Sequence, residues 1–84
     1  MLPAPRPAAP VKSIHSERYR RLLDLLVQAR KDAGITQVEL AKRLAKPQSF
    51  VSKFENGERR PDVIEFLDIC EAIGVSVAQV LAAV

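Results

Sequence analysis

The chain has 84 residues, which is the size of one small domain and excludes a two-domain enzyme. Hydrophobic residues make up 48% of it and charged residues 27%, which is typical of a folded globular domain and excludes a disordered or membrane-embedded composition. The net charge is only +3, but it divides into +4 over residues 1–34, +3 over 35–60 and −4 over 61–84. A basic part and an acidic part favour one-sided docking on a polyanion.

Residues 1–15 differ in composition from the rest of the chain. Four of the six prolines stand at positions 3, 5, 7 and 10, and proline fixes φ and lacks an N–H donor. This segment is therefore predicted to be an extended or disordered arm. It is either an inert leader or an arm that carries Arg6 and Lys12 towards a partner. Residues 16–84 are expected to form the folded domain.

Hydrophobic periodicity predicts two helices in the first half of the folded region. Apolar residues recur at helical spacing between Ser16, a suitable N-cap, and Gly34, which predicts a helix over about 17–33. Thr36 and Glu39 have the spacing of a capping box, in which each satisfies a free amide of the other. Leu40 and the apolar residues after it then predict a second helix over about 37–45.

A short third helix follows. Pro47 suits the first turn of a helix, Val51 and Phe54 lie three residues apart on one face, and Asn56-Gly57 supplies left-handed stop residues. We expect Phe50 to lie at the rim of the buried face.

Two more helices complete the expected fold. Asp62 and Glu65 form a second capping box, and the helix that they start runs to Gly74. Its buried stripe is expected to consist of Val63, Phe66, Leu67, Cys70 and Ile73. Ser76 caps a last short helix that ends at Val84. Five helices with tight connections and no strand candidate predict an all-α five-helix bundle.

The second and third helices are joined by a tight turn, and the third has an unusually polar outer face. A short helix, a tight turn and a polar exposed helix are the parts of a helix-turn-helix, whose second helix enters the DNA major groove. Glutamine can bond both edge positions of adenine, lysine can reach the guanine acceptors, and serine can bond either base. With Val51 and Phe54 turned inward, the outward residues are Gln48, Ser49, Ser52 and Lys53.

This segment resembles the Cro and phage-repressor type of helix-turn-helix, the xenobiotic-response-element family of bacterial regulators. The resemblance covers about residues 20–81. It implies a lambda-repressor-like fold that binds double-stranded DNA, usually as a homodimer on a short inverted repeat, and represses or activates promoters. The matching residues are Gly34-Ile35-Thr36-Gln37-Val38-Glu39-Leu40-Ala41, Gln48-Ser49-Phe50-Val51-Ser52-Lys53-Phe54-Glu55-Asn56-Gly57, Arg60-Pro61 and Ala72-Ile73-Gly74-Val75-Ser76.

The resemblance also implies roles for individual residues. Positions that match the family's base-reading set are Gln48, Ser49, Ser52 and Lys53. Gln37 resembles the residue that donates to a phosphate and props the recognition helix. Arg30 and Glu55 match an ion pair that ties the first helix to the third. The phosphate-binding set is completed by Asn56, Arg59 and Arg60, to which we add the basic turn residue Lys46. Two residues depart from the family pattern, since many members have Gly at Ala45 and Ser or Thr at Pro47.

An 84-residue bundle cannot bury all the apolar side chains of its last third, and leftover apolar area marks a contact surface. We expect a dimer interface formed by Ile64, Val77, Val80, Leu81 and Val84. Paired two-fold, such a surface would set two recognition helices about 34 Å apart, one turn of DNA.

Other function classes have weaker support. The chain has no Gly-rich phosphate loop, and its lone His and lone Cys lie far apart with no third partner, so we expect no enzymatic activity, no cofactor and no metal. An antitoxin or anti-regulator whose main partner is another protein stays an alternative. The Pro-rich arm and the acidic residues of the last third could bind that partner; the latter are Asp62, Glu65, Asp68 and Glu71. A phage repressor or the controller of a modification system would have the same chemistry. One cysteine, no signal-peptide pattern and no apolar run near the roughly 18 residues of a membrane span predict a cytoplasmic protein without a membrane partner.

Overall fold

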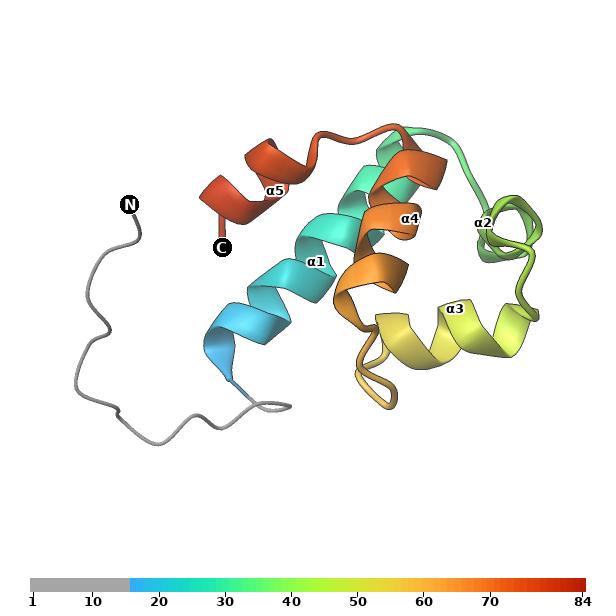
Figure 1. Cartoon of the computed structure of the whole chain (residues 1–84), viewed down its shortest axis with the longest axis horizontal. Coiled ribbons are helices and arrows are strands. Elements are labelled where there is room, and N and C mark those ends of the chain that lie inside the picture. The colour runs from blue at the N-terminus through green and yellow to red at the C-terminus, as the bar shows by residue number, and fades with distance from the viewer. Residues whose placement is uncertain (1–15) are drawn as a thin grey trace.

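The computed structural model describes residues 16–84, and the expected arm at residues 1–15 lies outside the described residues. The described part holds five α-helices and no strand: α1 (Glu17–Asp32), α2 (Gln37–Leu44), α3 (Gln48–Glu55), α4 (Val63–Ile73) and α5 (Val77–Ala82). The all-α five-helix prediction is confirmed. The long helix α1 forms the spine, with α2 and α3 at one end and α5 at its side (Figure 1). None of the described helices has the length and hydropathy of a membrane span.

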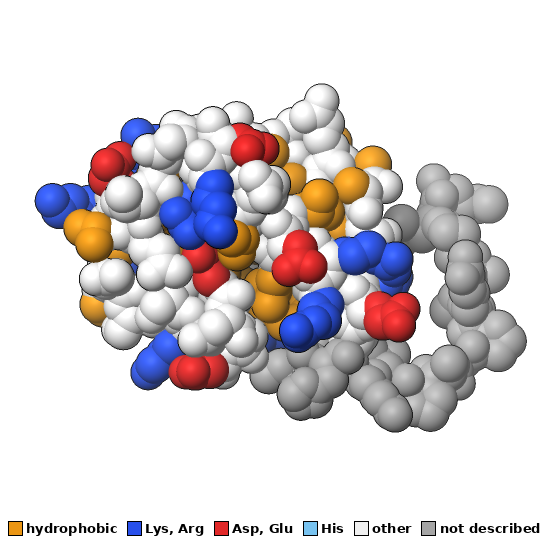
Figure 2. Space-filling view, turned by 180° about the vertical axis from the view of Figure 1, so that it is seen from behind, with side chains coloured by type: hydrophobic (Ala, Val, Ile, Leu, Met, Phe, Trp, Pro, Cys, Tyr) orange, Lys and Arg blue, Asp and Glu red, His pale blue; other side chains and the backbone are white. Residues whose placement is uncertain are grey.

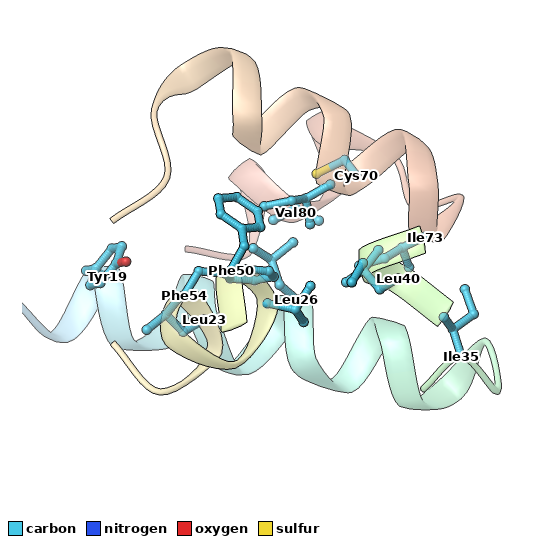
Figure 3. Close-up of a cluster of buried hydrophobic side chains, with 13 residues drawn as sticks. Tyr19, Leu23, Leu26, Ile35, Leu40, Phe50, Phe54, Cys70, Ile73 and Val80 are labelled. Atoms are coloured by element: carbon cyan, nitrogen blue, oxygen red, sulfur yellow. The ribbon is translucent and has the colours of Figure 1, made fainter. Parts of the chain in front are cut away.

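One hydrophobic core joins all five helices. Leu26 of α1, Leu40 of α2, Phe54 of α3 and Ile69 of α4 are at most 1% exposed, and Val80 brings α5 into the same cluster. Figure 3 shows Leu26, Leu40, Phe54 and Val80 converging with other core side chains between the helices. The core fixes α3 on its inner side and so decides which of its residues face outward.

Four helix starts have side-chain caps at the predicted residues. At α2 the Thr36 hydroxyl accepts the Glu39 N–H at 3.1 Å, but the Glu39 side chain makes no return bond to the Thr36 N–H, so the capping box predicted there is only half formed. The Ser16 hydroxyl accepts the Tyr19 N–H at 3.1 Å, and the Ser76 hydroxyl accepts the Gln79 N–H at 3.3 Å. At α4 the capping box is complete, because Asp62 accepts the Glu65 N–H and Glu65 accepts the Asp62 N–H. Such caps satisfy amides that have no partner within the helix, and they fix where α1, α2, α4 and α5 begin.

The predicted buried stripe of α4 is partly wrong. Val63 is 72% exposed and Leu67 is 40% exposed, whereas Ile69, which was not assigned to the stripe, is fully buried. Burial increases along the helix, from exposed Val63 through half-buried Phe66 to fully buried Cys70. The reason is that α4 leaves the core towards its N-terminus, so helical spacing alone does not bury its first turn.

Two backbone details also differ from expectation. Asn56 has φ −93° and is not left-handed, so Gly57 (φ +83°) alone supplies the left-handed stop after α3. Helix α2 ends one residue earlier than expected, at Leu44, because Ala45 takes φ +54° and serves as a left-handed C-cap. Glycine adopts this conformation most easily, which accounts for its frequency at this position in the family that the sequence resembles.

Candidate nucleic-acid interface

Helix α3 has an apolar inner face and a polar outer face. Val51 and Phe54 are fully buried, and Phe50 is 8% exposed, so Phe50 belongs to the core rather than to its rim as predicted. The residues predicted to read bases lie on the other face. Among these, Gln48, Ser49 and Lys53 are exposed, while Ser52 is half-buried and donates its hydroxyl to the Ser49 carbonyl at 3.3 Å. The structure therefore brings the four residues together on one helix, three of them open to solvent.

The turn between α2 and α3 is short and internally bonded. Ala45 in the left-handed conformation reverses the chain, and the Lys46 N–H donates to the Ala41 carbonyl at 3.0 Å. Pro47 then occupies the N-cap position of α3 with an extended backbone and no side-chain cap bond. This turn sets the orientation of α3 relative to α2 (Figure 1).

A buried ion pair joins α1 to α3. The Arg30 Nε donates to Glu55 Oε2 at 2.6 Å and its Nη2 donates to Oε1 at 3.0 Å, with side chains only 9% and 6% exposed. Arg30 Nη1 also donates to the Ile35 carbonyl at 2.8 Å. Gln37 donates its amide to Glu55 Oε1 at 2.9 Å, which connects the start of α2 to the end of α3. The carboxylate thus holds three helices of the site in register, and the pair implied by the resemblance is present.

The basic side chains near the first turn of α3 surround one aromatic ring. Lys46 Nζ lies 5.4 Å and Arg59 Cζ 4.7 Å from the centre of the Phe50 ring. Both cations also meet the Glu65 carboxylate. Its Oε2 lies 3.1 Å from Arg59 Nη2 and 3.9 Å from Lys46 Nζ. The Asp62 N–H first, and Arg59 next, lower the pKa of Glu65 below its ordinary value, since both bond its charged form.

The two remaining residues of the predicted phosphate-binding set lie elsewhere on the loop after α3. Arg60 stacks its guanidinium 4.4 Å from the Tyr19 ring, at the start of α1. Asn56 is exposed, but its side chain bonds both the backbone N–H and the carboxylate of Glu58, each at 3.2 Å. The predicted set therefore divides into the Lys46 and Arg59 pair beside Phe50, Gln37 on the buried carboxylate, and two loop residues.

The predicted dimer surface needs a correction at Val80. Val80 is 4% exposed and packs into the core, because α5 lies against α1. Leu81 is 54% exposed, and Val77 and Val84 are half-buried on the same helix or just after it. Hydrophobic side chains gather over α5 in Figure 2. Ile64 is 65% exposed but lies on α4, away from α5 (Figure 1), so it does not share that patch.

Two contacts of this region were absent from the sequence prediction. Glu65 was expected as a helix cap, and its contact with two cations of the predicted phosphate-binding set was not foreseen. Arg43 donates to the Ala72 carbonyl at 2.8 Å and ties α2 to the end of α4. The spacing of Arg59 and Glu65 around Pro61 is the one sequence signal for the first contact. No group of three metal-ligating side chains converges within residues 16–84.

Comparison with known proteins identifies a helix-turn-helix in this chain. A family model described as "Helix-turn-helix" matches residues 26–80. An HTH-type transcriptional regulator of Sinorhizobium fredii, y4dJ, is 38% identical over 47 residues, which are 56% of this chain and 61% of that protein. The chain thus matches about three fifths of that relative's length.

Solved structures extend the similarity over most of the described chain. An XRE-family like protein from Pseudomonas syringae pv. tomato shares 62% identity and a TM-score of 0.77, covering 82% of this chain and 86% of the other. The clp gene regulator ClgR from C. glutamicum shares 29% identity and a TM-score of 0.73, covering 81% and 87%. The restriction-modification controller C.Esp1396I, solved as a tetramer with its 35 base-pair operator, shares the fold at 19% identity and a TM-score of 0.73, covering 81% and 90%. The chain therefore belongs to the XRE type of the helix-turn-helix family of DNA-binding transcriptional regulators.

Proposed function

We propose that this regulator reads a specific sequence in double-stranded DNA by placing α3 in the major groove. The observation that carries the proposal is the division of α3, whose three apolar residues are buried while its outer face presents amide, hydroxyl and ammonium groups. These are the groups that bond base edges in the major groove. The base-reading residues are Gln48, Ser49, Ser52 and Lys53, and Ser52 contributes after its hydroxyl leaves the Ser49 carbonyl.

Phosphate contacts fix the register of α3 on the duplex in this proposal. Lys46 and Arg59 stand beside its first turn, with side chains that are each 45% exposed. Gln37 keeps one amide N–H for a phosphate, because only one of the two is used on Glu55. Arg60 and Asn56 are exposed on the loop that follows α3 and complete the set. Such contacts position a protein on DNA without reading its sequence.

The regulator acts as a homodimer on an inverted repeat and as a repressor in the function that we propose. Leu81 is exposed on α5 beside half-buried Val77 and Val84, and this apolar surface supports a second copy. C.Esp1396I is a controller protein solved as an oligomer on its operator. A dimer that occupies promoter DNA represses by excluding the polymerase. Because promoter DNA lies in the cytoplasm of a bacterial cell, this function implies that the protein is cytoplasmic.

The test of sequence-specific reading compares three single variants on a preferred duplex, selected from a random pool, and on a scrambled duplex. Gln48→Ala and Lys53→Ala are expected to weaken binding to the preferred duplex by about 1 to 3 kcal/mol each and to relax base preference. Arg60→Ala is expected to weaken both duplexes by the same factor. If Lys53→Ala also lowers both affinities by one factor, Lys53 is a phosphate contact and does not read a base.

A role in which another protein is the main partner is the second candidate. The apolar residues Val63, Ile64 and Leu67 at the start of α4 favour it, because they are exposed and are not buried in the core. Lys53→Glu separates the two candidates. Loss of DNA binding with the protein partner still bound would assign the two functions to different surfaces.

A further inference from the structure

The cluster of Lys46, Phe50, Arg59 and Glu65 has a geometry that neither base reading nor core packing explains. Arg59 meets the Glu65 carboxylate with both terminal nitrogens, Nη1 at 3.3 Å from Oε1 and Nη2 at 3.1 Å from Oε2. Lys46 approaches the same Oε2 at 3.9 Å. The ring of Phe50 lies within cation–π distance of both cations. One acid and one ring therefore constrain two long basic side chains from different segments.

The acid lies inside this cluster and the cations lie outside. The Glu65 side chain is only 14% exposed, whereas Lys46 and Arg59 are each 45% exposed. Arginine has five N–H donors in a fixed fork and Arg59 uses two of them on Glu65, so donors remain for an outer ligand. Two cations that meet on a single oxygen lie close enough together to contact one phosphate group.

We propose that Glu65 is a positioning residue, which gathers Lys46 and Arg59 into a paired site for one backbone phosphate beside the first turn of α3. This inference rests on the proposed function, since the ligand is a DNA phosphate. Unpaired lysine and arginine side chains lose many rotamers when they bind, and a carboxylate that orders them beforehand reduces that loss. The capping box fixes Glu65 in turn, because its Oε1 also accepts the Asp62 N–H at 3.0 Å.

The negative charge of Glu65 also repels DNA, so the positioning effect must be separated from the loss of one charge. Asp68 provides the matched control. It lies one turn further along α4, is exposed, and has no hydrogen bond or ion pair within the described residues. Glu65→Gln and Asp68→Asn remove the same charge from the same helix. Gln can still accept the Asp62 N–H in a capping box, so the start of α4 is preserved, which thermal melts of both variants check.

The experiment measures binding of the full chain to a mixed-sequence DNA duplex by fluorescence anisotropy over a series of salt concentrations. Glu65→Gln is expected to bind about three- to tenfold more weakly than Asp68→Asn, as two long side chains lose their preordering. Its log–log salt slope should be shallower by about 1 to 2, the signature of lost phosphate contacts. A merely structural role for Glu65 would leave the slopes of the two variants equal.

Lys46→Gln in two backgrounds gives a second readout. The substitution should weaken binding in the wild-type chain and do so by a clearly smaller factor in the Glu65→Gln chain, because Lys46 is then no longer held at the phosphate. Equal affinities and slopes for Glu65→Gln and Asp68→Asn, or equal effects of Lys46→Gln in both backgrounds, would overturn the positioning role while DNA binding stands. A wild-type chain that binds no duplex would overturn the proposed function itself.

Discussion

At the scale of single residues, Glu55 is the side chain that connects α1, α2 and α3. Its carboxylate accepts two bonds from Arg30 and one from Gln37, and all but 6% of its side chain is buried. Because its partners come from α1 and α2, losing its charge would disturb three helices at once. A guanidinium left buried without its counter-charge is strongly destabilising.

We therefore expect Glu55→Gln to lower the free energy of unfolding by about 3 to 5 kcal/mol, as measured by urea denaturation followed by circular dichroism. The matched control is Glu58→Gln, because Glu58 is exposed on the loop after α3 and its side chain bonds only Asn56. That change should stay within about 0.5 kcal/mol of the wild type. A neutral Glu55→Gln would show that the pair with Arg30 is solvated in solution.

Glu65 gives the stability of the protein a pH dependence with a defined sign. Its folded pKa lies below the ordinary value of 4.5, so the charged form stabilises the fold above that value. This contribution is lost as pH falls below 4.5 through the lowered folded pKa. The stability gap between wild type and Glu65→Gln should therefore be largest near neutral pH and shrink in acid, in melts from about pH 7 to about pH 3. A gap that stays constant over this range would exclude a titrating Glu65.

At the scale of elements, the turn between α2 and α3 determines how α3 is oriented. This turn contains a residue with a strained backbone conformation, Ala45. Ala45 has φ +54°, a conformation that disfavours any residue with a Cβ atom. Gly57 and Gly74 occupy the corresponding left-handed positions after α3 and α4 without that strain. Within residues 16–84, Ala45 is thus the one left-handed helix C-cap at which a substitution to glycine could relieve backbone strain.

Ala45→Gly is expected to raise the free energy of unfolding by about 0.5 to 1 kcal/mol, because relief of the strain outweighs the added freedom of the unfolded chain. Ala78→Gly is the control with the opposite sign. Ala78 is exposed inside α5, where glycine should destabilise by about 0.5 to 1 kcal/mol. Should thermal melts show Ala45→Gly to be as destabilising as Ala78→Gly, the left-handed turn would not exist in solution.

Helix starts could be predicted from the sequence more reliably than the burial of individual residues. Caps at Ser16, Asp62 and Ser76 are local, so residues within one turn suffice to predict where α1, α4 and α5 begin. The inner face of α3 was likewise predictable from Val51 and Phe54. By contrast, the exposure of Val63 and the burial of Val80 depend on where α4 and α5 meet α1, which is a tertiary property. The role of Glu65 was hidden for the same reason, since its partners lie on the α2–α3 turn and the loop after α3.

At the scale of the whole molecule, two separate apolar clusters are candidates for the surface through which two copies of the chain form a dimer. Leu81 belongs to the cluster on α5 and Ile64 to the one at the start of α4. Leu81→Lys is expected to reduce affinity for a full inverted repeat and to leave affinity for an isolated half-site unchanged, whereas Ile64→Lys should change neither. Anisotropy and stoichiometry on both duplexes check this. Equal affinity of the wild type for half-site and full repeat, with one chain on each, would rule out a dimer on DNA.

The central claim is that the outer face of α3, with the cations around it, binds duplex DNA. It is tested most directly by a salt titration of binding to DNA from upstream of the protein's own gene, for wild type and Lys53→Glu. A dimer with about 6 to 10 phosphate contacts predicts a log–log slope of roughly −5 to −9 for the wild type, with binding strongly reduced by Lys53→Glu on the exposed face of α3. A flat salt response with no difference between the two proteins would contradict the account.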